Sequence, residues 1–510
     1  MKVFVACPPN TVTGGVEQLH QLCKELNKYP WIDAKIWYVS IDLMDPPPKE
    51  YDEYGNEYVV TMEPEIGSTL IFPEVYASLV NHPKFAVFRK VIYWESVDNY
   101  LLNTPPEEAL KFPNGILHLA QSYYAIDFLH EFVKASDDNI IFVSDYLNES
   151  YLTAEPKAER KRQVAYNPAK GYEFTQKVID AMPETRFVPI KGMSKDQVKD
   201  LLCESALYVD FGNHPGKDRI PREACTCGCC VITSTKGSAK FFDDVPINDC
   251  YKINIDEEDS VEHCKRIITD ALDNYDYHNA YFASYREQIR AERKWFEQGV
   301  ESLAMRLKQP RFSIIIPAHN AEEHGLRAFN SVKSQRFTDY ECIVVCDACE
   351  DLTEDAAKAF GFNAVSTNFG NDGLARSKGL DMAQGEWVLF MDDDDWWLHE
   401  YVLEQIAAKL EQFDCDVLCF SFIFKGVGYA QPLGNQGYPW PAVWNKCWRR
   451  KFIGETRFPN VYSISDAYFH GEMMAKNPTM AIWDMPLYYY NYLRPGSISE
   501  LAQKGDKNGN

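Results

Sequence analysis

The chain has 510 residues, 45% of them hydrophobic, and a formal net charge of −23. This length predicts about three domains, each large enough to bury a core. The acidic balance argues against a general nucleic-acid binder, because such proteins neutralise phosphates with clustered Lys and Arg side chains. Any phosphate group must therefore be bound locally.

Fifteen cysteines are spread along a chain that opens with MKVFVACPP, a short strand and a loop rather than a secretory signal. We therefore expect reduced thiols and a cytoplasmic protein. No stretch reaches the roughly 18 to 20 apolar residues of a membrane-spanning helix, so contact with the inner face of a membrane is expected to be peripheral only. The oligomeric state is left open.

The first third of the chain alternates apolar strand patterns with helical patterns, which predicts a parallel sheet with helices on both faces. The expected elements are strands at 2–6, 34–39, 90–93, 115–119 and 139–143, with a first helix at 16–27. The charged segment TAEPKAERKR has no apolar periodicity and indicates a boundary. The first domain is therefore expected at residues 1–155.

The same alternation restarts after this boundary. The expected strands are 163–166, 185–189, 206–211 and 230–233, followed by a mostly helical region at 261–307. Gln309-Pro310 closes that region, because proline does not continue a helix. A second α/β domain is expected at residues 156–309.

A third α/β unit is expected at residues 310–510. Its predicted elements are strands at 312–316, 341–346 and 386–391, and helices at 323–334 and 373–383. Three polar stretches end these strands: PAHN, CDACED and DDDD. Ligands bind beyond the carboxyl ends of strands in an open parallel sheet, so these stretches are expected to converge. Taken singly, PAHN and CDACED are equally consistent with capped strand ends.

The run Asp392 to Asp395 directly follows an apolar strand, and four adjacent carboxylates repel one another unless a cation lies among them. Asp392 and Asp394 are separated by one residue and are expected to bind Mn²⁺ or Mg²⁺, with positions left open for a diphosphate. Such a metal stabilises the charge on a departing nucleotide diphosphate. A phosphatase of the haloacid dehalogenase type is disfavoured, because Trp396 and Trp397 follow where a small hydroxyl residue is expected. A calcium loop lacks its Gly-punctuated spacing.

The third unit resembles the family 2 glycosyltransferases, which have the GT-A fold. The resemblance covers about 190 residues and lies in six stretches: SIIIPAHNAE, IVVCDACEDLT, NDGLARSKGLDMAQGEWVLFMDDDDWW, VWNKCWRRKF, TRFPNVYSISDAYF and PLYYYNYLRPGSIS. It implies an inverting, metal-dependent transferase that uses a nucleotide sugar. Asp392 and Asp394 match the metal-binding Asp-x-Asp, and Arg376 matches a basic residue near the diphosphate.

The same resemblance implies further site residues. Asp347 would contact the nucleobase, although Cys346 stands where the family usually has a second aspartate. Pro317, Asn320 and Asp393 are expected to line the donor site at the same strand ends.

A base must accept the proton of the acceptor hydroxyl on the side opposite the leaving group. The family uses a Glu-Asp pair before a helix, which here reads Ser465-Asp466, so Asp466 is the candidate base. The alternative role of Asp466 is an N-cap of the helix at 467–475. Trp444 and Lys446 are expected to line the acceptor site, where aromatic faces stack on sugar rings; the tryptophans of this stretch are equally consistent with core residues.

In the first domain, Gly14 and Gly15 open a helix, where backbone can approach a diphosphate; a tight turn needs such glycines equally. In the second domain, the loop after the strand at 206–211 carries His214, Lys217 and Arg219 beside a helix start, which predicts an anion site. The cysteines at 225, 227, 229 and 230 lack the spacing of a zinc site and are expected to be core residues.

Residues 1–308 resemble the GT-B glycosyltransferases of family 4, with two facing Rossmann-like domains. The resemblance implies that Glu223 binds the donor ribose and that Lys170 binds phosphate. The family's earlier glutamate, which touches the donor sugar, is Pro215 here, and His214 is a candidate substitute. The donor and the activity of this half are therefore open.

The leading hypothesis is a bifunctional glycosyltransferase of the hexosyltransferase type, with a metal-independent GT-B site and a metal-dependent GT-A site. Both would move sugars from nucleotide-sugar donors, UDP-sugars being favoured, to a glycan or glycoconjugate acceptor. In one alternative only the GT-A half is catalytic and the GT-B half is a scaffold or acceptor-binding module. Others are glycosylation of modified DNA bases, which the acidic charge disfavours, and a non-catalytic nucleotide-sugar-binding protein.

Overall fold

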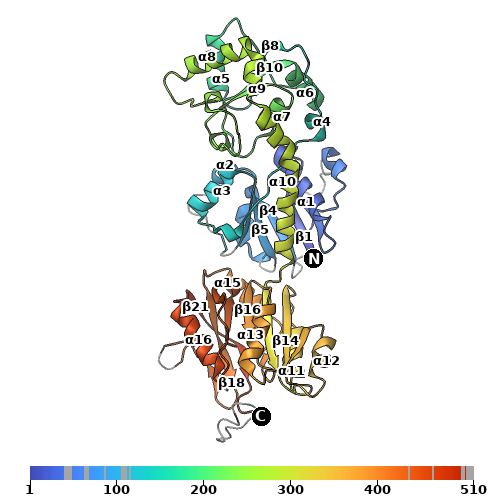
Figure 1. The fold of residues 1–510 in the computed structure, drawn as a ribbon, viewed down its shortest axis with the longest axis vertical. Helices are drawn as coiled ribbons and strands as arrows, with labels where there is room; N and C mark the ends of the chain where they lie inside the picture. The colour runs from blue at the N-terminus through green and yellow to red at the C-terminus, as the bar shows by residue number, and fades with distance from the viewer. Residues whose placement is uncertain are drawn as a thin grey trace.

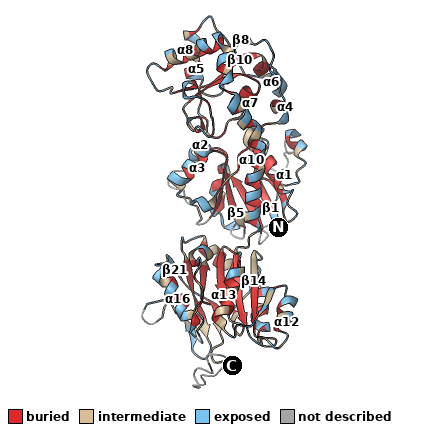
Figure 2. Cartoon of the chain, in the orientation of Figure 1, coloured by how far each residue is buried: buried red, intermediate tan, exposed pale blue. Residues whose placement is uncertain are grey.

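Three β-sheets, each with its own helices, follow one another along the long axis of the molecule (Figure 1). The structure is a computed structural model that describes residues 1–39, 49–61, 68–85, 88–104, 112–113, 116–434, 437–461, 464–495 and 500. The first residue of the strand expected at 115–119 and parts of the last two motifs lie outside these ranges. Strands are buried along most of their length and helices are exposed on their outer sides (Figure 2).

The first sheet has seven parallel strands in the order β3-β2-β1-β4-β5-β6-β7. The strands are β1 Lys2–Cys7, β2 Asp33–Tyr38, β3 Tyr58–Val59, β4 Thr69–Pro73, β5 Arg89–Trp94, β6 Leu117–Ala120 and β7 Ile140–Phe142. The helices are α1 Gly14–Leu26, α2 Val97–Asn103, α3 Tyr123–Phe128 and α4 Glu149–Leu152. The central strands are buried on both faces, as in other parallel sheets covered by helices.

The second sheet has five parallel strands in the order β12-β11-β10-β8-β9. They are β8 Lys161–Tyr166, β9 Arg186–Pro189, β10 Ser205–Asp210, β11 Cys230–Ser234 and β12 Lys252–Ile253. The helices are α5 Tyr172–Ala181, α6 Lys195–Glu204, α7 Arg219–Thr226, α8 Ser260–Asp273 and α9 Tyr275–Ala280. The four clustered cysteines are fully buried in the core of this unit. The expected α/β architecture with parallel sheets is thus confirmed.

Helix α10, Ala283–Lys308, belongs to the cores of both units. Its first half contributes Tyr285 and Ile289 to the core of the second sheet. Its second half contributes Phe296 and Leu303 to the core of the first sheet. One continuous helix therefore ties the two units together (Figure 1).

The third sheet has nine strands, of which β19 pairs only with β18 and the others run in the order β15-β14-β13-β16-β20-β18-β21-β17. The strands are β13 Phe312–Ala318, β14 Tyr340–Asp347, β15 Asn363–Thr367, β16 Trp387–Phe390, β17 Trp396–Trp397, β18 Val417–Phe424, β19 Gly428–Ala430, β20 Lys446–Arg449 and β21 Met480–Tyr490. The helices are α11 Leu326–Lys333, α12 Thr353–Ala359, α13 Asp372–Met382, α14 Val402–Leu410, α15 Arg450–Ile453 and α16 Ser465–Ala475. Strands β13 to β16 are parallel, whereas β20 is antiparallel to both of its neighbours.

The junction between α10 and the third sheet is built on Arg89, at the start of β5. Its guanidinium donates hydrogen bonds to the backbone carbonyls of Leu307 (3.2 Å), Gln309 (3.1 Å) and Arg306 (3.1 Å). These carbonyls are at the end of α10, where a cation is favoured by the helix dipole. Arg89 therefore ties the end of the long helix to the edge of the first unit.

The third sheet meets the first unit through the amino ends of its strands. Lys90 forms a 2.7 Å ion pair with Glu411, which follows α14, and Arg311 lies 3.4 Å from the same carboxylate. Trp387, the first residue of β16, lines the small cavity at this junction. The carboxyl ends of β13 and β16 consequently lie at the far end of the sheet.

In the described ranges, no helix is long and apolar enough to span a membrane.

Replacing Arg89 by Ala is expected to lower the free energy of unfolding by about 2–3 kcal/mol, because three carbonyls lose a charged donor. Urea and thermal unfolding of the full chain measure this loss. Arg266→Ala, at an exposed position of α8, serves as the control and should change stability by no more than about 0.5 kcal/mol. Equal stability of the two variants would contradict the assigned role of Arg89.

Candidate functional site

Polar loops converge at the carboxyl ends of β13, β14 and β16, because β13 pairs in parallel with both of the other strands. The His319 backbone N–H donates to Asp393 Oδ2 (3.0 Å), which joins the first and third loops. The Glu350 N–H donates to Asn320 Oδ1 (2.8 Å), which joins the first and second loops. Pro317, Asn320 and Asp393 thus lie along one sheet edge, and their contact with a donor stays a prediction.

Asp347 is held by the loop that leads into α13. Its carboxylate accepts hydrogen bonds from Thr367 Oγ1 (2.9 Å) and from the backbone N–H groups of Phe369 (2.6 Å) and Asn371 (2.8 Å). The side chain of Asn371 in turn caps α13 by accepting from Leu374 N–H. Asp347 therefore orders the loop at the start of α13, and its contact with a nucleobase stays a prediction.

Arg376, on α13, is buried among three carboxylates. Its guanidinium lies 2.6 Å from Asp392 Oδ1 and 3.1 Å from Asp466 Oδ1, and it also forms an ion pair with Asp372. Burial lowers the pKa of Arg376, but Asp466, Asp392 and Asp372 outweigh it and hold the pKa well above its ordinary range. One permanent cation thus joins the aspartate run to the candidate base.

The last two aspartates of the run, Asp394 and Asp395, contact the C-terminal segment. Arg494 Nε donates to Asp394 Oδ2 (2.7 Å), and the Tyr488 hydroxyl donates to Asp395 Oδ2 (2.6 Å). Burial raises the pKa of Asp392 and of Asp394, and repulsion from neighbouring aspartates adds to both shifts. The site therefore has more negative charge than its arginines balance.

This donor set fits a divalent cation. Asp392 binds Arg376 through Oδ1 and Asp394 binds Arg494 through Oδ2, which leaves Asp392 Oδ2 and Asp394 Oδ1 without a protein donor among the described residues. Carboxylate oxygens are the ligands that Mg²⁺ and Mn²⁺ prefer. A cation would also relieve the repulsion that raises these pKa values.

Asp466 lies in the first turn of α16, whose N-cap is Ile464. It is therefore not the N-cap, and the capping alternative does not describe it. Burial raises the pKa of Asp466 to about 6, with Asp392 and Asp372 adding to the shift and Arg376 opposing it. Its role as a base stays a prediction.

Trp444 and Lys446 lie in the core rather than on an acceptor surface. The Trp444 ring stacks on Tyr488 at 4.9 Å between centroids. Lys446 is completely buried, and its ammonium donates to the carbonyls of Trp440 and Ala442 at 2.6 Å each. Burial lowers the pKa of Lys446 to about 8. The core alternative therefore describes Trp444, and Lys446 is buried as well, so neither side chain is open to a sugar.

In the N-terminal half, made of the first two sheet units and α10, side chains occupy the space at the start of α1. A Cβ on Gly14 would lie 3.1 Å from Arg219 Cδ, and one on Gly15 would lie 3.0 Å from Glu95 Oε2. Gly14 and Gly15 do open the helix, with Thr13 as its N-cap. The side chains of Arg219 and Glu95 therefore lie against these glycines, where a diphosphate was expected.

Six charged residues, five of them buried and Arg219 partly buried, join the second sheet unit to the first and to α10. The ion pairs are Arg219–Glu17 (2.6 Å), Arg219–Asp145 (3.1 Å), Arg222–Asp145 (2.8 Å), Arg222–Glu292 (2.7 Å) and Lys217–Glu292 (2.8 Å). Burial alone raises the pKa of Asp145, but Arg222 and Arg219 bring it to about 2. Three cations thus balance three carboxylates. Lys217 and Arg219 are neutralised by the protein, and an anion there would have to break this network.

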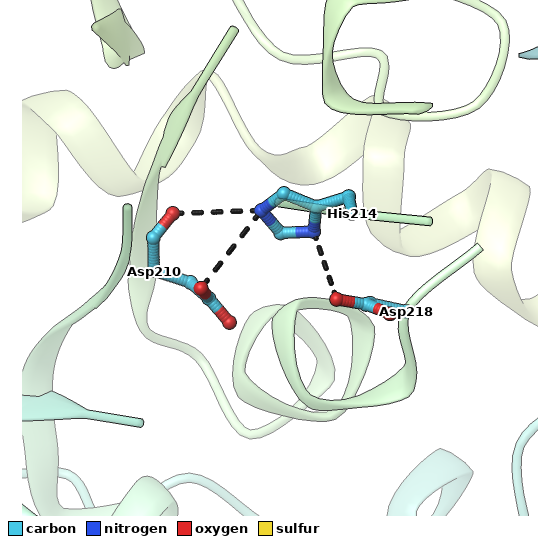
Figure 3. A group of neighbouring side chains, drawn as sticks. All are labelled: Asp210, His214 and Asp218. Atoms are coloured by element: carbon cyan, nitrogen blue, oxygen red, sulfur yellow. Dashed lines mark hydrogen bonds and ion pairs between the residues drawn. The ribbon is translucent and has the colours of Figure 1, made fainter. Parts of the chain in front are cut away.

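Lys170 and His214 meet at Asp218. His214 Nδ1 lies 3.1 Å from Asp218 Oδ2, Lys170 Nζ lies 2.7 Å from the same oxygen, and His214 Nε2 faces Asp210 (Figure 3). In the described part of the chain, Asp210, His214 and Asp218 are the one group of three potential metal ligands that come together. The carboxylates of Asp210 and Asp218 lie at opposite nitrogens of the His214 ring, and Lys170 already pairs with Asp218. This arrangement favours an imidazolium bridging two carboxylates.

Glu223 is the remaining residue of the N-terminal half that was expected to bind the donor. Burial raises its pKa to about 7, against the opposing effects of Arg219 and Arg222. Its contact with a ribose stays a prediction.

The sequence analysis did not identify Asp372, Arg494 and Glu95, which lie beside the predicted site residues Arg376, Asp394 and Gly15. Asp372 lies four residues before Arg376, a spacing that brings two side chains together on a helix and could have been used. Arg494 is 100 residues from its partner Asp394, and no local pattern reports such a contact.

Replacing Glu292 by Gln is expected to cost roughly 3–5 kcal/mol of stability, because Arg222 and Lys217 lose a shared buried carboxylate. Thermal unfolding of the full chain measures the loss. Glu297→Gln on the same helix is the matched control, because Glu297 is 40% exposed and its ion pairs are screened by water. Similar losses in both variants would mean that the buried network contributes little.

Residues 313–479 match the family model described as glycosyl transferase family 2. The poly(ribitol-phosphate) beta-N-acetylglucosaminyltransferase TarS of Staphylococcus aureus is 33% identical over 210 residues, which are 38% of this chain and 34% of TarS. The crystal structure of S. aureus TarS 1-349 in complex with UDP-GlcNAc has a TM-score of 0.34 and 25% identity, covering 37% of this chain and 60% of that chain.

A crystal structure of a glycosyltransferase from Rickettsia africae has a TM-score of 0.44 and 12% identity, and covers 60% of this chain and 98% of that chain. This chain spans about a third of the length of TarS. The match to the family model covers less of the chain than the Rickettsia africae structure does, and it lies wholly within the third sheet unit. The match to the glycosyl transferase family 2 model thus covers residues 313–479, and this region is called the family 2 domain below.

Proposed function

We propose that the C-terminal domain transfers a sugar from a nucleotide-sugar donor to the hydroxyl of a glycan or glycoconjugate, with inversion at the anomeric carbon. The contact that carries this proposal is the pairing of Arg376 with both Asp392 and Asp466. It brings the expected metal ligand and the candidate base to the two terminal nitrogens of one guanidinium. A donor and an acceptor could then meet beside this group.

On the donor side, Asp392 and Asp394 would hold Mn²⁺ or Mg²⁺. When bound, this cation supplies positive charge to the nucleotide diphosphate as it departs. Arg376 fixes the position of Asp392, and Asp347 orders the loop before α13. We favour a UDP-sugar. The name of the relative TarS supports N-acetylglucosamine as the sugar and a poly(ribitol-phosphate)-like polymer as the acceptor.

On the acceptor side, Asp466 accepts the proton of the attacking hydroxyl. The new bond forms between the acceptor oxygen and the anomeric carbon while the bond to the diphosphate oxygen breaks. A carboxyl with a pKa of about 6 is mostly ionised at neutral pH and is a stronger base than an ordinary aspartate. The burial that raises this pKa therefore suits the group to proton transfer.

We expect kcat/KM to rise with pH through about 6, because only ionised Asp466 can accept the proton. Asp466→Asn should lower kcat by about 10²–10⁴-fold, the usual contribution of a general base. Asp381→Asn, at an exposed carboxylate on α13, should leave the rate unchanged. A pH profile that is flat from 5 to 8, or an active Asp466→Asn variant, would exclude this base.

For the N-terminal half, the buried network supports the scaffold or acceptor-binding hypothesis over a second transferase. Lys217 and Arg219, the cations expected at a diphosphate, are already paired with Glu292, Glu17 and Asp145. A GT-B site would have to open against these ion pairs before a donor could bind. The charge that such a site needs is therefore already used in holding the two units together.

Nucleotide release from UDP-, GDP-, CMP- and dTDP-sugars, with and without Mn²⁺, distinguishes these hypotheses. We expect a single metal-dependent activity that Asp394→Ala abolishes and Glu223→Ala leaves intact. A second activity that survives chelation and disappears in Glu223→Ala would establish the bifunctional enzyme. An Asp394→Ala variant with full activity would exclude the proposed metal site.

A further inference from the structure

Two cysteines in a Cys-x-x-Cys spacing, Cys346 and Cys349, lie at the carboxyl end of β14. Cys346 is one residue before the end of the strand, and its side chain is buried in the core of the third sheet unit. Ala348 has a left-handed φ of 52°, which turns the chain back after the strand. Cys349 therefore packs against the same core, and its thiol forms a hydrogen bond with that of Cys346.

The two thiols differ in exposure and in acidity. Cys346 is 1% exposed, whereas Cys349 is partly exposed. The hydrogen bond from Cys346 lowers the pKa of Cys349 to about 6, against the opposing effect of burial. The Asn320 N–H also favours the Cys349 thiolate, whereas Asp351 opposes it. Because a thiolate is the nucleophile in thiol–disulfide exchange, Cys349 suits the attacking role and buried Cys346 the resolving one.

The Cys349 thiol also ties together the loops at the candidate donor site. Its Sγ accepts the Asn320 backbone N–H (3.3 Å) and lies 3.4 Å from the Ala318 carbonyl oxygen, to which a thiol donates. The next residue, Glu350, donates through its N–H to Asn320 Oδ1 (2.8 Å). Asp347, between the two cysteines, holds the loop before α13. A change at Cys349 thus reaches two of the loops that are expected to bind the donor.

We propose that Cys346 and Cys349 form a thiol-oxidation site, at which a low-molecular-weight disulfide converts them to an intramolecular disulfide that weakens donor binding. In the first step, the Cys349 thiolate attacks one sulfur of the small disulfide and a small thiolate leaves. In the second step, Cys346 gives up its proton and attacks Cys349 Sγ, and the second small thiolate leaves. The two protein thiols are oxidised, the small disulfide is reduced, and the two thiol protons end on the leaving groups.

The disulfide would change what Cys349 offers to its neighbours. It removes the S–H group that faces the Ala318 carbonyl and the negative charge that faces the Asn320 N–H. It also draws Cys349 towards buried Cys346, because bonded sulfurs lie closer together than hydrogen-bonded ones. The loops of Asn320 and Glu350 would then leave the arrangement in which they meet. This regulation rests on the proposed function.

Oxidised glutathione added to the full chain tests the site, with peptide mapping of the disulfides and isothermal titration with UDP or GDP in the presence of Mn²⁺. We expect a bond between Cys346 and Cys349 and a nucleotide affinity about tenfold or more lower, which dithiothreitol restores. Cys346→Ser should stop at a glutathione adduct on Cys349, because the resolving thiol is gone. Cys349→Ser should form neither species and bind nucleotide equally before and after the oxidant.

Cys203→Ser is the matched control, because Cys203 forms another hydrogen-bonded thiol pair, with Cys227 in the second sheet unit. This variant should respond to the oxidant as the wild type does, and protection by it would overturn the assignment to Cys346 and Cys349. An oxidised chain without the expected bond, or with the bond and an unchanged nucleotide affinity, would overturn the regulation and leave the proposed function intact. A reduced wild-type chain that binds neither nucleotide would overturn both.

Discussion

The site of the family 2 domain depends on one buried guanidinium, that of Arg376. It draws together Asp372, Asp392 and Asp466, which come from α13, from the end of β16 and from α16. Without a permanent cation these carboxylates would repel one another in a desolvated place, and at least one would bind a proton at neutral pH. The spacing between the expected metal ligand Asp392 and the candidate base Asp466 is therefore set by electrostatics as much as by the sheet.

The two halves of the chain use buried arginines with opposite results. In the N-terminal half, Arg219, Arg222 and Lys217 meet an equal number of carboxylates, which leaves no charge for a ligand. In the C-terminal domain, the carboxylates outnumber the arginines, and burial together with repulsion from neighbouring aspartates raises the pKa values of Asp392 and Asp394. A balanced network stabilises an interface, whereas an unbalanced one attracts a cation.

Much of this could be predicted from local sequence. The parallel strands and the aspartate run could be predicted because each depends on a pattern within a few residues, an apolar run or a row of adjacent carboxylates. Lys446 was not, because a charged residue among tryptophans suggests a surface, and only the carbonyls of Trp440 and Ala442 make its burial tolerable. Arg494 and the antiparallel strands β18, β20 and β21 depend on pairings between distant segments, which periodicity does not report.

The direction of β13 and β16 has a geometric consequence for how a long substrate could use the molecule. Their amino ends meet the N-terminal half, so the candidate site is a full strand length away, about 23 Å for the seven residues of β13. Helix α10 runs about 39 Å beside both N-terminal units, because its 26 residues pack in both of their cores and its last carbonyls meet Arg89 at this junction. A polymer anchored on the N-terminal half would reach the site only above a minimum length. The distance from the junction to the carboxyl ends of β13 and β16 would then set that minimum length.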